Sequence, residues 1–251
     1  MLIEILLVGA VAGFVQGLSG FAFALVATSL WAWMMEPQRI VPLVVMGSLL
    51  GQSVAILSVR SEISLVRIRP FVIGGLVGVP IGASFLHALN ADTFRPLFGL
   101  GLIVFCTVML RISKLPTIQA GLAADGCVGL VSGTLSGACG MGGPPMTIWC
   151  AMRGWSARAQ RATFQTSFIV TQTLGLGIYA WQGMIDMPML QALAALAPVI
   201  ICFSWLGSRV GKKLRDAQFR KIVFVLLLIS GFVLVMPAAK LAGLAVWRSI
   251  G

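Results

Sequence analysis

The sequence predicts an all-α polytopic membrane protein, and three observations lead to this fold class. First, 59% of the 251 residues are hydrophobic and the mean hydropathy is +1.00. Second, 10% of the residues are charged, well below the roughly 25% usual in soluble domains. Third, the charges separate uncharged runs long enough to cross a bilayer as helices, which takes about 20 residues. There is room for about eight such segments and none for a sizeable soluble domain, so residues 1–251 are expected to form a single transmembrane domain.

Polar breaks divide the chain into hydrophobic segments. These are residues 5–35, 41–59, 71–89, 94–110, 126–152, 162–185, 187–208 and 222–239. The first segment of each half is too long for one untilted span and contains several glycines, so we expect a Gly-broken or re-entrant helix in each. Pro37 lies in the first polar break and fits the start of a helix.

The basic residues and the cysteines narrow the class further. The formal net charge is +11, but the Lys and Arg residues lie between apolar segments, as in cytoplasmic loops of membrane proteins. They therefore predict topology, and no nucleic acid is expected as a partner. Five cysteines without a C-x-x-C pair indicate neither a disulfide framework nor a metal site, and no cofactor is implied.

The two halves of the chain are predicted to be homologous, with internal repeats at about 1–112 and 120–240. A shift of 125 residues and a shift of 117 residues align similar positions. The aligned positions are Gly82 with Gly207, Phe94-Arg95 with Phe219-Arg220, and Leu18-Ser19-Gly20 with Leu135-Ser136-Gly137.

The distribution of basic residues favours inverted repeats. If the first segment of each half returns to its own side, all Lys and Arg residues except Arg39, Arg95, Lys240 and Arg248 fall on one side. If every segment crosses once, the asymmetry is weaker. The positive-inside rule prefers the first arrangement, with both termini outside the cytoplasm. Transporters with inverted repeats commonly bind their substrate where interrupted helices of the two halves meet.

The stretch 133–145 is the strongest candidate for a site, because it combines five glycines with Pro144-Pro145 in an uncharged segment. Irregular backbone at membrane depth survives where it is buried in protein or lines a wet cavity. Free N–H groups at a helix N-terminus suit an anion. The predicted substrate-binding residues are Gly140, Gly142, Gly143, Ser136, Ser19 and Gln165, with Gln16 and Gln52 as weaker candidates.

Charged residues near the segments have two interpretations each. Asp125 is a candidate for carrying a coupling proton, or else a helix-start carboxylate that compensates the dipole. Arg161 could pair with an anion, but at a segment end we expect it to reach the interface. Small residues such as Gly13 and Gly17 also serve simply to let helices pack closely.

Two other function classes are a passive anion channel and an intramembrane protease. Composition does not separate a carrier from a passive anion channel. Gly17-Leu18-Ser19-Gly20 fits the G-x-S-G string of rhomboid-type intramembrane proteases, but residues 133–137 do not repeat it and His87 lies close to a membrane edge. We therefore do not expect an enzyme.

Two stretches resemble the TauE/SafE family, the sulfite exporter or toluenesulfonate uptake permease family. They are GFVQGLSGFAFALV at residues 13–26, with EPQRIVP at 36–42, and GLVSGTLSGACGMGGPP at 129–145. Gly140, Gly142 and Gly143 match the G-x-G-G core of the family signature, whereas Phe21 to Ala24 stand where glycines are usual. The resemblance covers essentially the whole chain.

This resemblance implies a multi-pass transporter of the bacterial inner membrane for substrates such as sulfite, thiosulfate, sulfonates or sulfoacetate. We expect a secondary carrier of a small anion, working by alternating access of one half against the other. The lipid bilayer is its expected surrounding, and homo-oligomer formation is left open.

Overall fold

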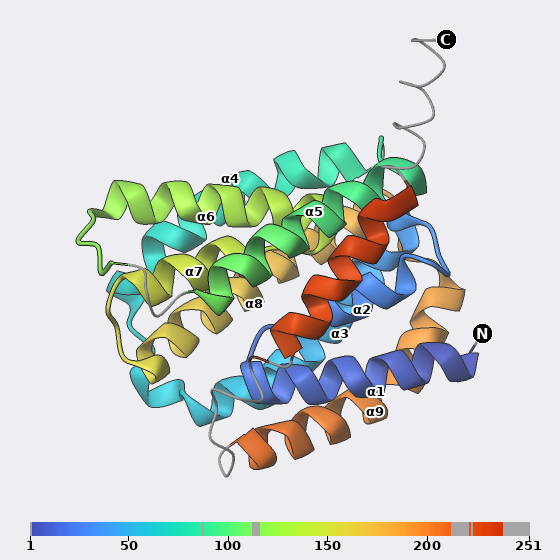
Figure 1. Cartoon of the computed structure of the whole chain (residues 1–251), viewed down its shortest axis with the longest axis horizontal. Coiled ribbons are helices and arrows are strands. Elements are labelled where there is room, and N and C mark those ends of the chain that lie inside the picture. Colours follow the sequence, from blue (N-terminus) through green and yellow to red (C-terminus); the bar gives the residue numbers. More distant parts are fainter. Residues whose placement is uncertain (1, 87, 112–115, 212–220, 222, 238–251) are drawn as a thin grey trace.

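The computed structural model describes residues 2–86, 88–111, 116–211, 221 and 223–237, and these residues contain helices and no strand. The helices are α1 (Leu2–Ser19), α2 (Phe23–Trp31), α3 (Pro37–Ala55), η1 (Ile56–Ser58), η2 (Arg60–Glu62), α4 (Leu65–Leu86), α5 (Ala91–Leu110), α6 (Leu122–Cys139), α7 (Gly143–Met152), α8 (Ala157–Trp181), α9 (Met187–Gly211) and an apolar helix over Val223–Pro237 (Figure 1).

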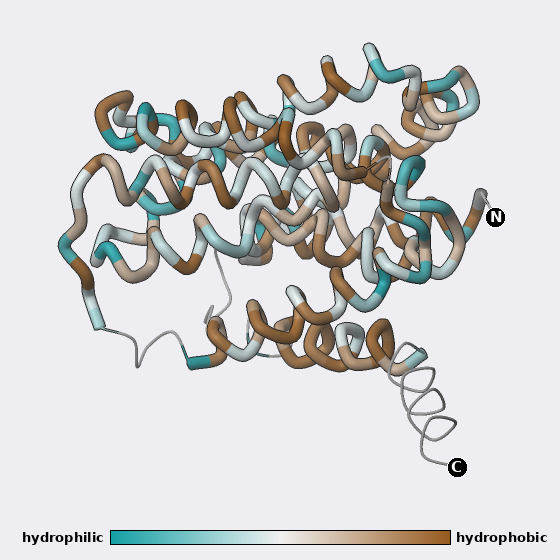
Figure 2. Tube along the Cα trace, turned by 90° about the horizontal axis from the view of Figure 1, so that it is seen from above, coloured by the Kyte–Doolittle hydropathy of each residue, from teal (hydrophilic) through white to brown (hydrophobic). Residues whose placement is uncertain are grey.

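The protein is an all-α polytopic membrane protein. In the described residues, five helical stretches are long and apolar enough to cross a membrane, and they fall on α3, α4, α5, α6 and α9. Hydrophobic residues follow the lengths of the helices, and hydrophilic residues gather mainly toward the ends of the bundle (Figure 2). This pattern suits helices whose flanks face lipid.

The first hydrophobic segment of each half is broken, as predicted. α1 and α2 are separated by residues 20–22, and α6 and α7 by residues 140–142. Each break begins with a glycine in the left-handed region, Gly20 at φ 87° and Gly140 at φ 70°, which only glycine adopts readily. These glycines are 120 residues apart. The shift of 117 residues would instead place Gly20 on Gly137 inside α6. That shift matches identical residues, whereas the bend occurs three residues later in the second half.

Both broken segments turn back toward the end from which they came. At the second, the Ile118 N–H donates to the Met152 carbonyl at 2.8 Å, so the end of α7 lies beside the start of α6. At the first, Arg39 at the start of α3 lies 3.6 Å from Asp186 at the start of α9. α9 runs alongside α1 in the same direction, so the start of α9 lies near the start of α1. The chain that leaves α2 and begins α3 has therefore returned to the end where α1 began. In Figure 1, α1 and α6 begin at opposite ends of the molecule.

The most extensive helix contacts join α4 to α6 and α1 to α9. Glycines let the backbones touch there. A Cβ atom built on Gly82 of α4 would lie 2.0 Å from the Thr134 oxygen, and one built on Gly17 of α1 would lie 2.0 Å from the Ser204 oxygen. Gly82 and Gly207 face α6 and α1 in the same way, Gly207 lying against the Phe14 oxygen. Phe219 and Arg220, the other part of that alignment, lie outside the described residues.

Candidate anion site at the helix breaks

The two breaks meet inside the molecule. The three atoms nearest to a Cβ built on Gly143 all belong to Phe21, with the ring Cδ2 at 3.3 Å. The Phe21 ring makes edge-to-face contacts with Phe105 at 5.9 Å and with Phe164 at 5.8 Å between ring centroids. The start of α7 therefore faces the first break across an aromatic side chain.

The first break is closed by its own side chains. The Ser19 hydroxyl accepts hydrogen bonds from the N–H groups of Phe21 at 3.3 Å and Ala22 at 3.1 Å. Gln16 Oε1 accepts from the Phe23 N–H at 2.9 Å, and Gln16 Nε2 donates to the Ser48 carbonyl at 3.3 Å. Ser19 and Gln16, both predicted to bind substrate, thus bond to the break itself: Ser19 accepts from the two residues before α2, and Gln16 accepts from the first amide of α2.

The second break leaves amides open. The Gly140 and Met141 N–H groups bond back to Ser136 and Leu135, which closes the end of α6 in a Schellman-type turn. Within the described part of the chain, no hydrogen bond is seen from the N–H groups of Gly142 or Gly143, and the prolines that follow have no N–H. Amides at a helix start lack intrahelical acceptors, so these two are available to a ligand.

Serine side chains of α6 support this break. Ser136 is buried, and its hydroxyl lies 3.2 Å from a Cβ built on Gly142. The Ser132 hydroxyl donates to the Gly142 carbonyl. Gly140, Gly142, Gly143 and Ser136 therefore lie together at this break. Sequence reasoning did not single out Ser132, because its contact with Gly142 depends on the bend.

Gln165 and Arg161 of α8 meet the C-terminal end of α1. Gln165 Nε2 donates to the Gly20 carbonyl at 3.2 Å, and Arg161 donates to the Leu18 carbonyl at 3.1 Å. Donors at these carbonyls offset the negative end of the helix dipole. Arg161, expected at the interface, thus reaches the first break instead. Gln165 is 1% exposed, and its Oε1 atom has no hydrogen-bond partner among the described residues.

Gln52 lies apart from the breaks, at the contact between α3 and α8. Its Nε2 donates to Gln172 Oε1 at 2.9 Å, and both side chains are buried. These two glutamines are 120 residues apart, like the left-handed glycines. The structure therefore places Gln52 in a pair that joins the two helices, and Gln172 is the partner that sequence reasoning did not single out.

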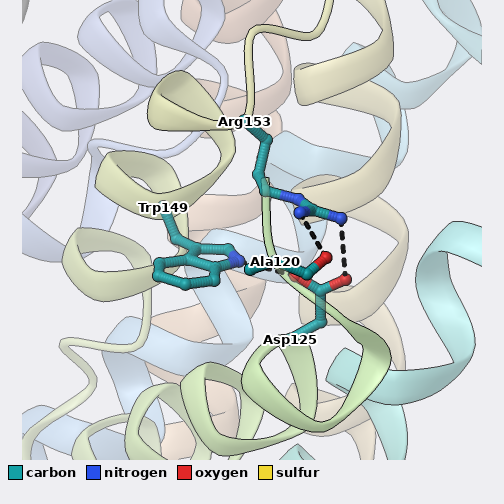
Figure 3. Close-up of polar contacts among 4 residues, drawn as sticks. All are labelled: Ala120, Asp125, Trp149 and Arg153. Atoms are coloured by element: carbon teal, nitrogen blue, oxygen red, sulfur yellow. Dashed lines mark hydrogen bonds and ion pairs between the residues drawn. The ribbon is translucent and has the colours of Figure 1, made fainter. Parts of the chain in front are cut away.

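Asp125 lies in the first turn of α6, at the opposite end of that helix from the break. Figure 3 shows its polar contacts with Trp149 and Arg153. Its carboxylate is 2% exposed and accepts from Trp149 Nε1 at 2.7 Å, and Arg153 forms an ion pair with it at 3.4 Å. Arg153 also donates to the Ala120 carbonyl and lies over the Trp155 ring at 5.3 Å. Asp125 thus fastens the two arms of the hairpin together from the first turn of α6, where a carboxylate also compensates the helix dipole.

The broken helices, the buried amides at their junction and the apolar flanks define a polytopic membrane protein of the transporter class. The family model for the sulfite exporter TauE/SafE matches residues 5–234, and the chain belongs to this family. It is a transporter and not an enzyme, which sets aside the protease interpretation of Ser19.

One relative is the probable sulfite/organosulfonate exporter TauE of Cupriavidus necator, 28% identical over 171 residues. That match covers 66% of this chain and 66% of the relative's length. A comparison with solved structures finds no match.

Proposed function

We propose that the protein is a secondary carrier of a small sulfur-containing or organic oxyanion, such as sulfite, thiosulfate or a sulfonate, in the bacterial inner membrane. The observation that carries this proposal is the start of α7, where the amides of Gly142 and Gly143 lack acceptors among the described residues, while the corresponding amides of Ala22 and Phe23 bond to side chains. Membership of the TauE/SafE family and the printed name of the C. necator relative support the substrate class.

The chemistry of the break fits an oxyanion. Two amide donors and the positive end of a helix dipole favour negative charge. Gly142 and Gly143 carry no side chain that would keep oxygen atoms away from these amides. The nearest buried carboxylate seen in α6, Asp125, lies at the other end of that helix and is already paired with Arg153.

Thermal-shift binding tests this proposal, because a ligand that binds the folded state raises its melting temperature. The purified protein is titrated with sulfite, thiosulfate and methanesulfonate, and with chloride at equal ionic strength. We expect stabilisation by the sulfur oxyanions only. Gly143→Ala should weaken their binding at least tenfold, since its Cβ enters the cradle. Gly177→Ala is the matched control, because a Cβ there has no neighbour within 4 Å.

Equal shifts with chloride and the oxyanions would contradict the proposal. Flux in liposomes then separates carrier from channel: saturation and counter-exchange support a carrier, and ohmic current supports a passive anion channel.

We infer that the two halves are inverted repeats, and that each of the two units that move during transport contains one helix from the other half. The 120-residue spacing of Gly20 and Gly140, and of Gln52 and Gln172, supports the duplication. The glycine contacts join α4 of the first half to α6 of the second, and α1 to α9. One unit would then contain α1, α2, α3 and α9, and the other α4, α6, α7 and α8. This differs from a simple movement of one half against the other.

Cross-linking in a cysteine-free background tests these units. A short bifunctional thiol reagent on Gln52→Cys with Gln172→Cys joins the two units and should stop transport reversibly. The control pair, Gly75→Cys with Thr171→Cys, lies within one unit, and its Cβ atoms would be 3.7 Å apart, which suits a disulfide. Transport that continues with the first pair joined would contradict the proposed units.

A further inference from the structure

The side chain that covers the start of α7 comes from the other break. Phe21 supplies the three atoms nearest to a Cβ on Gly143, at 3.3, 3.9 and 4.0 Å. Its side chain is buried, and edge-to-face contacts with Phe105 and Phe164 hold the ring in place. An anion that reaches the Gly142 and Gly143 amides must therefore fit beside this ring or displace it.

The corresponding place in the first half is filled. Phe23 precedes Gly143 by 120 residues and begins α2 as Gly143 begins α7. The Phe23 ring is fully buried against Gly47, with its Cε1 atom 2.6 Å from a Cβ built there, and contacts Trp31 edge to face. The first residue of α2 thus carries an aromatic ring. The first residue of α7, Gly143, has no side chain, and the ring of Phe21 packs against it instead.

Gln165, which bonds to the residue before Phe21, carries a buried polar atom without a partner among the described residues. Gln165 is 1% exposed and bonds through Nε2 to the carbonyl of Gly20, the residue before Phe21. That bond fixes the amide orientation and leaves Oε1 as an acceptor without a donor. A buried acceptor is normally satisfied by protein, water or ligand. Because an oxyanion has no N–H or O–H group to donate, a buried water molecule is the partner that fits this atom.

We propose that Phe21 is the specificity-determining residue of this site and restricts the substrate to compact oxyanions, such as sulfite or methanesulfonate, over aryl sulfonates. This inference rests on the proposed function. The ring occupies the space that a bulky group on the sulfur atom would need. Its removal leaves a space of about the size of the missing side chain, into which the ring of benzenesulfonate would fit.

The test measures binding of methanesulfonate and benzenesulfonate to the full chain, purified and folded. The variants are the parent, Phe21→Ala, and Phe98→Ala as a control. Phe98 is equally an aromatic of the interior, but it stacks on Phe94 within α5. We expect the parent to prefer methanesulfonate at least tenfold, Phe21→Ala to bind benzenesulfonate at least tenfold more tightly than the parent, and Phe98→Ala to keep the parent ratio.

A parent that binds methanesulfonate while Phe21→Ala keeps its selectivity would overturn the inference and leave the proposed function standing. A parent that binds neither sulfonate, sulfite nor thiosulfate would refute the proposed function and the inference with it. If Phe21→Ala does not fold, Phe21→Leu replaces it, with an expected gain of at least threefold for benzenesulfonate. An unchanged ratio in that variant would count equally against the role of Phe21.

Discussion

Replacing Gly82 by Ala should force α4 and α6 apart. The added Cβ would lie 2.0 Å from the Thr134 oxygen and 2.8 Å from the Ala138 nitrogen. Both atoms belong to the backbone, so no side-chain rotation can relieve the overlap. Restoring an ordinary contact of 3.4 Å requires the helices to separate by about 1.4 Å at this point.

The expected cost follows from two opposing effects. Overpacking of a well-packed interior costs about 1–3 kcal/mol, and Ala in place of a helical Gly returns up to about 1 kcal/mol. Gly177→Ala in α8 has the second effect without the first, because a Cβ there has no neighbour within 4 Å. The propensity gain is common to both variants, so they should differ by the overpacking cost alone, about 1–3 kcal/mol in the free energy of unfolding.

Thermal unfolding of the purified variants measures this difference. In a chain of this size it corresponds to roughly 2–12 °C in melting temperature, with Gly82→Ala below the parent and Gly177→Ala at or above it. Gly17→Ala should behave like Gly82→Ala, because its Cβ would lie 2.0 Å from the Ser204 oxygen. Two variants as stable as the parent would refute direct backbone contact in these helix pairs.

Two further predictions concern buried polar pairs. Asp125→Asn leaves the partly exposed Arg153 without its ion pair and should lower stability by about 2–3 kcal/mol, as a melting curve would show. Uptake driven by a pH gradient should persist in that variant if Asp125 only fastens the hairpin, and its loss would instead identify Asp125 as the coupling residue. Gln52→Leu or Gln172→Leu alone should cost about 1–3 kcal/mol by leaving an amide unpaired, while the double variant recovers most of this; additive losses in a double-mutant cycle would contradict the pairing.

Charge patterning predicted the membrane class and the broken segments well, but it placed several helix starts too late. α4 begins at Leu65, ahead of Arg67 and Arg69, and α8 begins at Ala157, where the Ser156 hydroxyl accepts from the Ala159 N–H at 3.2 Å. A helix can continue beyond the apolar stretch into a polar end region. Segments defined by the absence of charge therefore begin after the helices do.

The candidate site was predictable in the second half and much less so in the first. The glycines and prolines of residues 140–145 restrict the backbone directly, so their sequence reports the break itself. The sequence shows Gln16 and Ser19 as polar residues in an apolar segment whether they bind a substrate or the backbone. The bend is what brings their oxygen atoms to the N–H groups of Ala22 and Phe23. The pairing of α4 with α6 was equally hidden, because close-packing glycines do not specify which helix they face.

The differences between the breaks explain how two similar structures can leave one place for a ligand. Each break exposes the first amides of a short helix inside the membrane, where an unpaired N–H group is costly. In the first break, Ser19 and Gln16 accept from the amides of Ala22 and Phe23, and the Phe23 ring fills the space. The second replaces that ring by Gly143 and supplies no capping side chain to the amides of Gly142 and Gly143 among the described residues. An anion bound there would complete the hydrogen bonding that the first half completes with its own side chains, so substrate binding and stability of the second hairpin should be coupled.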